Sequence, residues 1–123
     1  MVKSDGLTER QVERLLISGL KALGYLPVKT DAGARARWAK EATGRPVRGD
    51  MPAGFPDIVV LHPSKPAFLV EVKRKGGRLS TAQVRLHDYL RSMGYNVYVV
   101  VGREGVDGFL RTLPEWERVK GVL

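Results

Sequence analysis

Asp57, Glu71 and Lys73 are the residues of this chain whose types and spacing could do chemistry together. Two carboxylates held close to one another cannot both ionise comfortably unless a cation lies between them. A hard divalent ion is the usual partner, and Mg²⁺ suits a site with few protein ligands and several waters. A lysine beside such an ion could act on an attacking water or on developing phosphate charge. The alternative is that Glu71 and Lys73 are solvated residues at a strand end and that Asp57 helps a turn.

A predicted hairpin would bring these side chains together. Residues 57–61 and 67–72 are short apolar runs rich in β-branched residues, and the proline-rich turn between them is typical of neighbouring strands. If the hairpin is centred on Ser64, Asp57 lies directly opposite Glu71. The lysine two positions after Glu71 points to the same face. The expected result is two carboxylates and an ammonium group at one end of an apolar ribbon.

The same residues carry a resemblance to a known family. Pro56-Asp57 followed by Glu71-Val72-Lys73 is similar to the signature of the PD-(D/E)xK nucleases. The stretches GFPDIVV, FLVEVKRKGGRLSTAQ and GYNVYVV, in this order, resemble the VRR-NUC branch of that superfamily.

The resemblance implies a metal-dependent DNA endonuclease whose in-line attack leaves a 5′-phosphate. It implies Mg²⁺ as the cofactor, with Mn²⁺ as a substitute, and no organic cofactor. It assigns metal ligation and catalysis to Asp57 and Glu71, with the Val72 carbonyl as a further ligand. It also assigns a catalytic role to Lys73 and a supporting one to Gln83.

Residues 8–23 are predicted to form the first helix, with Thr8 as the N-cap and Gln11 completing a capping box. Its buried face is expected to consist of Val12, Leu15, Leu16, Leu20 and Leu23. Glu9 and Glu13 lie one turn apart along an edge of that face, where the helix dipole favours acidic residues in the first turn. The resemblance implies that an acidic residue of this helix lies beside the metal. The sequence leaves the choice between Glu9 and Glu13 open.

A second helix is predicted to begin at Ser80, where Ser80 and Gln83 form another capping box. This gives Gln83 a purely structural interpretation beside the supporting role in catalysis. The inward stripe of the helix is expected to be Ala82, Leu86, Tyr89, Leu90 and Met93. His87 on this helix and His62 in the hairpin turn lack metal-ligand spacing, and both are interpreted as non-catalytic.

The charge of the chain favours a polyanionic partner. Lys and Arg number 21 against 13 Asp and Glu, a net charge of +8. The alternative is a solvated basic surface without a partner. Basic side chains gather around Trp38 in the long irregular segment 31–53 and in the turn 74–78 beside the proposed metal site. The residues expected to contact DNA are Lys29, Arg35, Arg37, Lys40, Arg45, Arg48, Arg74, Lys75 and Arg78.

The order of elements predicts an α/β fold with a central mixed β-sheet flanked by helices. The resemblance identifies this as the restriction-endonuclease-like PD-(D/E)xK fold, with residues 1–123 forming a single VRR-NUC nuclease domain. A further strand is expected over residues 25–30, although Pro27 weakens this prediction and suggests an edge strand or a bulge. Another strand, expected to be buried, is predicted over residues 95–101. A turn over 102–105 then leads into a short helix over 106–113.

The absence of cysteine and of long apolar runs limits the kinds of site and the cellular location that we expect. The chain has no cysteine, which excludes disulfides and cysteine-based zinc sites. The first residues lack the apolar core of a signal peptide, and no apolar run approaches the roughly 20 residues that span a bilayer. We therefore expect a cytoplasmic protein that does not contact membranes.

Motif, charge and resemblance together predict hydrolysis of DNA phosphodiester bonds. The resemblance to stand-alone phage and bacterial VRR-NUC domains implies selectivity for branched DNA such as four-way (Holliday) junctions. Paired cuts in a junction need two active sites, so a symmetric homodimer is expected. No base-reading motif is visible, which favours recognition of DNA shape and backbone. The alternatives left open are a flap, nicking or restriction-type nuclease on the same fold, and a non-catalytic DNA-binding module.

Overall fold

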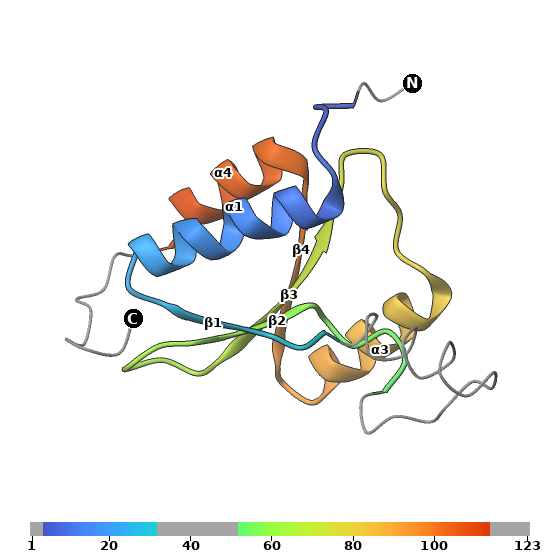
Figure 1. Ribbon diagram of the computed structural model, residues 1–123. Coiled ribbons are helices and arrows are strands. Elements are labelled where there is room, and N and C mark those ends of the chain that lie inside the picture. The colour runs from blue at the N-terminus through green and yellow to red at the C-terminus, as the bar shows by residue number, and fades with distance from the viewer. Residues whose placement is uncertain (1–3, 32–51, 114–123) are drawn as a thin grey trace, which may run out of the picture.

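The computed structural model describes residues 4–31 and 52–113 of the chain (Figure 1). Its elements are α1 (Glu9–Ala22), β1 (Leu26–Lys29), β2 (Ile58–Leu61), β3 (Phe68–Lys73), α3 (Thr81–Ser92), β4 (Asn96–Val101) and α4 (Gly102–Arg111). Among the described helices, none has the length and apolar character needed to span a membrane. Trp38 and five of the predicted DNA contacts lie outside the described residues; these contacts are Arg35, Arg37, Lys40, Arg45 and Arg48.

The four strands of the described chain form one mixed sheet in the order β1-β2-β3-β4. β2 is antiparallel to both β1 and β3, whereas β4 is parallel to β3. In the hairpin, Ile58 pairs with Val70 and Val60 with Phe68, so the register is centred on Ser64 as predicted. This topology confirms the predicted α/β class with a central mixed sheet.

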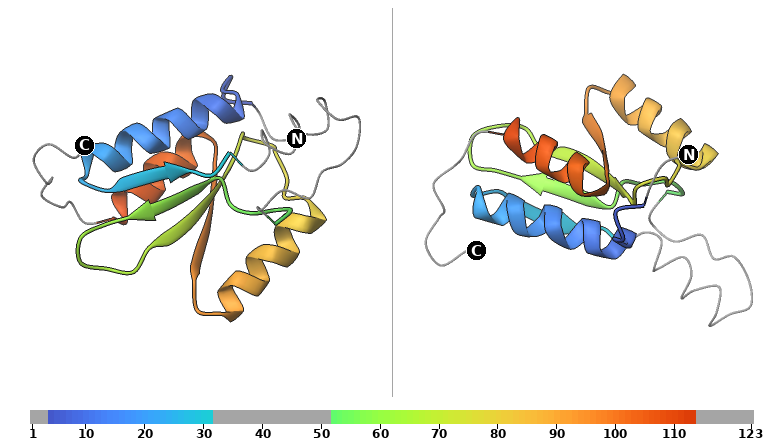
Figure 2. Two further views of the ribbon diagram at one scale, coloured as in Figure 1. Left: turned by 60° about the horizontal axis from the view of Figure 1, so that its bottom comes forward. Right: turned by 90° about the horizontal axis from the view of Figure 1, so that it is seen from above.

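Helices cover the sheet from both sides (Figure 2). α1 and α4 lie side by side on one face, where their apolar side chains enclose alternate residues of the inner strands, among them Ile58, Val70 and Val72. α3 lies on the other side and packs Leu90 against Leu69 of β3 and Val97 of β4. Because successive residues of a strand point to opposite faces, Glu71 and Lys73 share the α3 face with Leu69.

Capping boxes fix the first residues of α1 and α3, as the sequence predicts. The Gln11 N–H donates to the Thr8 hydroxyl at 3.2 Å, and the Thr8 N–H donates to Oε1 of Gln11 at 2.8 Å. Ser80 and Gln83 repeat the arrangement at 3.1 and 2.8 Å. Each box satisfies two of the backbone donors that a helix N-terminus leaves unpaired. α1 therefore begins at Glu9, with the side chain of Glu9 in the first turn.

The inward face of α3 differs from the predicted stripe. His87 and Leu90 are the buried residues of this helix, whereas Tyr89 is 61% exposed and Met93 50% exposed. Ala82, also in the predicted stripe, is exposed. Tyr89 and Met93 continue the apolar spacing of Leu86 and Leu90, so periodicity alone cannot say which side of the helix meets the sheet.

The last strand and helix also depart from expectation. Only Val97 and Val100 of β4 are buried, because β4 is an edge of the described sheet and α3 covers only part of it. α4 begins at Gly102 instead of Val106. The Arg103 N–H donates to the carboxylate of Asp5 at 2.9 Å, so a side chain distant in sequence caps this helix. A local sequence window cannot reveal such a cap.

Candidate metal centre

Asp57 and Glu71 lie opposite each other at the end of the β2–β3 hairpin. Their pairing continues the observed register by one step beyond Ile58 and Val70. The Val72 N–H donates to Oδ2 of Asp57 at 2.8 Å, which ties the Asp57 side chain to β3. The hairpin thus holds Glu71 on β3 and Asp57 at the position directly before β2.

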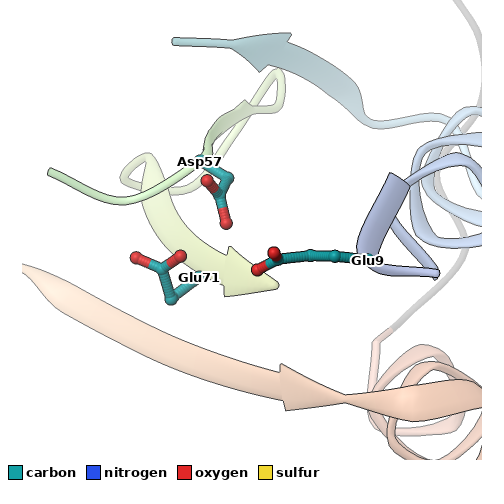
Figure 3. Close-up of side chains that lie close together, drawn as sticks. All are labelled: Glu9, Asp57 and Glu71. Atoms are coloured by element: carbon teal, nitrogen blue, oxygen red, sulfur yellow. The ribbon is translucent and has the colours of Figure 1, made fainter. Parts of the chain in front are cut away.

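Glu9 completes a cluster of three carboxylates. One oxygen from each of Glu9, Asp57 and Glu71 lies within 4.8 Å of the others, and Figure 3 shows the three side chains converging from α1, from the residue before β2, and from β3. We call these three residues the acidic cluster. It forms because the first turn of α1 lies beside the end of β3.

The structure separates Glu9 from Glu13, which the sequence left equivalent. Oε1 of Glu13 lies 2.9 Å from Nζ of Lys29 on β1, and Glu13 is not part of the acidic cluster. Of the two candidate metal ligands on α1, Glu9 is therefore the one whose position fits. Lys29, predicted to contact DNA, is 46% exposed and pairs with Glu13.

This separation predicts opposite outcomes for two matched substitutions. Glu9→Gln should weaken metal-dependent cleavage by about 10–100-fold, because one charged oxygen ligand is lost. Glu13→Gln should leave cleavage and metal affinity within about twofold of the wild type, because it removes only a partly exposed ion pair. Titration of cleavage rate against Mg²⁺ concentration measures both. Equal effects of the two substitutions, or a larger effect of Glu13→Gln, would contradict the assignment.

Lys73 lies at the rim of the acidic cluster. Its Nζ is 3.8 Å from Oε1 of Glu9, and its side chain is only 14% exposed. It projects from β3 on the same face as Glu71, two residues further along. The ammonium group of Lys73 is therefore held beside Glu9 at the edge of the acidic cluster.

The electrostatics of the acidic cluster favour a divalent cation. Burial, together with the neighbouring Asp57 and against the effect of Lys73, raises the pKa of Glu71 to about 9. Burial also raises the pKa of Glu9, again against the effect of Lys73. Without a metal, Glu71 is therefore protonated at neutral pH. A divalent ion would take the place of that proton, since metal binding requires deprotonated ligands.

The donor set fits a hard metal. All the candidate side-chain ligands are carboxylate oxygens, which suit Mg²⁺ and Mn²⁺ and not metals that prefer sulfur. Glu71 is 1% exposed, and its Oε1 forms no aligned hydrogen bond with any group of the described residues. Burying a polar oxygen without a hydrogen-bond partner costs on the order of 1–3 kcal/mol. A cation in the cluster would remove part of that penalty.

His87 is the residue near the cluster that the sequence did not single out for a role. It is completely buried, and its Nε2 lies 3.2 Å from Oε1 of Glu71. Burial, followed by the charge of Arg91, lowers the pKa of His87 and keeps the imidazole neutral at physiological pH. The available signal was a polar residue on the inward face of α3, between the apolar Leu86 and Leu90.

Gln83 and Val72 have structural contacts of their own. Oε1 of Gln83 accepts the Ser80 N–H, as the capping interpretation predicts. The Val72 N–H is committed to Asp57. The supporting role of Gln83 and the metal contact of the Val72 carbonyl stay predictions.

Basic side chains follow Lys73 in the turn after β3. An open cleft of about 750 Å³ lies where β3 and β4 end; its basic lining residues are Lys75, Arg78 and Arg103, and Asp5 and Glu104 contribute acidic side chains. Arg74, the first residue after β3, is exposed. Three of the predicted DNA contacts that lie among the described residues are therefore in the turn after β3; they are Arg74, Lys75 and Arg78.

Both the sequence and the fold of this chain are similar to those of VRR-NUC domains. The sequence profile of the VRR-NUC domain matches residues 28–104, more than half of the chain. A solved structure described as a VRR-NUC domain superposes with a TM-score of 0.62 at 24% identity, covering 85% of this chain and 97% of that one. No curated protein matches the sequence significantly. The profile match begins after α1, so the position of Glu9 in the cluster comes from the structure.

Proposed function

Because the chain belongs to the VRR-NUC domain family, we propose that it is a metal-dependent endonuclease that hydrolyses DNA phosphodiester bonds, with Mg²⁺ as its metal and branched DNA as its substrate. Membership makes it a nuclease-family protein that acts on DNA. The observation that supports the finer proposal is the acidic cluster with Lys73 at its rim.

Each residue of the site has a defined task in this proposal. Glu9, Asp57 and Glu71 would hold the ion, with the Val72 carbonyl as a further ligand. Bound Mg²⁺ supplies Lewis-acid chemistry, lowering the pKa of a coordinated water and neutralising phosphate charge. Lys73 orients the attacking water and stabilises the negative charge that develops on the phosphate. Gln83, at the start of α3, would support the arrangement.

The basic turn after β3 would direct the DNA backbone toward the acidic cluster. Lys75 and Arg78 line the cleft at the ends of β3 and β4, and Arg74, the first residue after β3, is exposed. Such side chains bind phosphates irrespective of sequence. Selectivity would then come from the shape of the DNA, which suits a branched substrate.

Paired cuts in a four-way junction would require two copies of the site. The described residues carry one acidic cluster per chain, so we include a symmetric homodimer in the proposal. Sedimentation of the full chain, alone and on junction DNA, tests this part separately from the chemistry.

The function is tested with a panel of labelled DNA substrates in Mg²⁺ and in EDTA. The panel contains a four-way junction, a 5′ flap, a plain duplex and a single strand, and Asp57→Asn serves as the inactive control. We expect symmetric cuts in the junction that disappear in EDTA and in the variant. Cutting of the flap or duplex instead would keep the chemistry and overturn the junction proposal. Binding without any cutting would indicate a non-catalytic DNA-binding module.

A further inference from the structure

His87 and Glu71 contact each other in the interior between α3 and β3. His87 is 0% exposed and Glu71 1% exposed, and 3.2 Å separates Nε2 of the ring from Oε1 of the carboxylate. Neither of these atoms, nor the second ring nitrogen, forms an aligned hydrogen bond with another group in the described part of the chain; other polar groups beside the pair are the Gly54 backbone near the ring and Asp57 near the carboxylate. Buried polar atoms are normally paired, so each of these two groups is the natural partner of the other.

Rigid elements fix the distance between the two side chains. Glu71 lies in the central hairpin, and His87 lies one turn after the capping box that starts α3. Gly54, with φ of +85°, brings the segment before Asp57 into backbone contact with α3. A Cβ at Gly54 would lie 2.5 Å from the Ala82 carbonyl oxygen and 2.7 Å from the Gln83 nitrogen. The helix that carries His87 is therefore docked directly on the segment that carries Asp57.

We propose that His87 is a positioning residue for the metal centre, whose Nε2–H donates to Oε1 of Glu71 and holds that carboxylate in the orientation that binds a divalent cation. This inference rests on the proposed function, because it concerns the same acidic cluster. It gives α3 a part in metal binding through a residue that touches a ligand and not the ion. Groups that hydrogen-bond a ligating carboxylate orient it and tune its affinity for the metal.

Packing alone does not explain a histidine at this position. The neighbouring inward residues of α3, Leu86 and Leu90, are apolar and join the cluster around Leu69. An apolar side chain at position 87 would fill the same space but leave Oε1 of Glu71 without a donor. The chain instead places its one buried helical imidazole, among the described residues, against the most buried carboxylate of the cluster.

The test compares three variants of the full chain in the absence of DNA. His87→Leu keeps apolar volume and removes the donor, His87→Gln places an amide N–H near the position of Nε2, and Leu90→Ala destabilises the same helix without touching Glu71. Mn²⁺ affinity is measured by calorimetry, and Mg²⁺-induced thermal stabilisation by melting. We expect His87→Leu to weaken Mn²⁺ binding by about 10–100-fold, His87→Gln to recover most of it, and Leu90→Ala to lower only the melting temperature.

The outcomes separate this inference from the proposed function. If the wild type binds neither Mn²⁺ nor Mg²⁺, the proposed function itself is wrong. If the wild type binds metal and His87→Leu binds it equally well, the function stands and the positioning role is wrong.

A pair of amide variants keeps the test decisive should His87→Leu fail to fold. The Gln amide reaches the position of Nε2, whereas the shorter Asn amide reaches that of Nδ1. We expect His87→Gln to bind Mn²⁺ more tightly than His87→Asn. Equal affinities for the two variants would overturn the proposal.

Discussion

Glu71→Gln should abolish cleavage and, at the same time, make the metal-free protein more stable at neutral pH. Cleavage is expected to fall by about 1,000-fold or more, because the variant loses a ligand charge at the centre of the acidic cluster. The stability of the metal-free variant at pH 7 should rise by on the order of 2 kcal/mol, or roughly 5–10 °C in melting temperature. Loss of function coupled to a gain in stability distinguishes a functional carboxylate from a structural one.

The stabilisation has a defined dependence on pH. Burial raises the pKa of Glu71 from 4.5, its ordinary value in the unfolded chain, to about 9 in the folded protein. Between these values the folded protein binds more protons than the unfolded chain, so the metal-free wild type loses stability as the pH rises through this window. Glutamine cannot ionise, and the variant should lack that decline. Melting curves from pH 5 to pH 9 in EDTA measure the difference.

Bound metal should make the wild type more stable than Glu71→Gln, the reverse of the order expected in EDTA. Mg²⁺ binds the folded state and should raise the melting temperature of the wild type as its concentration increases, but not that of Glu71→Gln. Glu104→Gln on α4 is the matched control, since Glu104 is exposed and lies outside the acidic cluster. A Glu71→Gln protein that still cuts DNA, or that is less stable than the wild type in EDTA at pH 8, would remove Glu71 from the metal centre.

The hairpin could be read from the sequence because its geometry is local. A short turn centred on Ser64 sets the register, and the register alone places Asp57 opposite Glu71. The capping boxes of Thr8 and Ser80 are equally local, and both are present in the structure. Where the information lies within a few residues, pattern and stereochemistry determine the result.

The remaining parts of the candidate site depend on how distant elements pack. Glu9 and Glu13 are one turn apart on the same helix. Only the packing of α1 against β1 determines that Glu13 pairs with Lys29 and that Glu9 lies beside Asp57 and Glu71. The side of α3 that meets the sheet is likewise set by its packing against β4 and Gly54. The same packing brings His87 into contact with Glu71. Helical periodicity defines faces but not their partners, so neither contact could be predicted.

Lys73→Met should separate chemistry from metal binding. Cleavage under single-turnover conditions is expected to fall by about 100–1,000-fold, because the variant loses the charge that stabilises the transition state beside the phosphate. Metal affinity should stay within about threefold of the wild type. Lys73 contributes no ligand atom, and its ammonium, 3.8 Å from Glu9, repels a metal ion more than it helps one. The Mg²⁺ concentration at half-maximal rate and the Mn²⁺ affinity measured by calorimetry report on binding independently of the rate.

Lys73→Arg shows which property of the lysine matters. Arginine keeps the positive charge but cannot give up a proton at accessible pH, so it supports electrostatic stabilisation and not proton transfer. We expect it to recover about tenfold of the activity lost in Lys73→Met, since neutralising phosphate charge needs only a nearby cation. An arginine variant as inactive as the methionine one would instead point to proton transfer by the lysine. If metal affinity fell in parallel with cleavage in both variants, the effect of Lys73 would lie in assembling the acidic cluster. Glu71→Gln and Lys73→Met would then fail in the same way, and the division between residues that hold the ion and the residue that acts on the phosphate would be wrong.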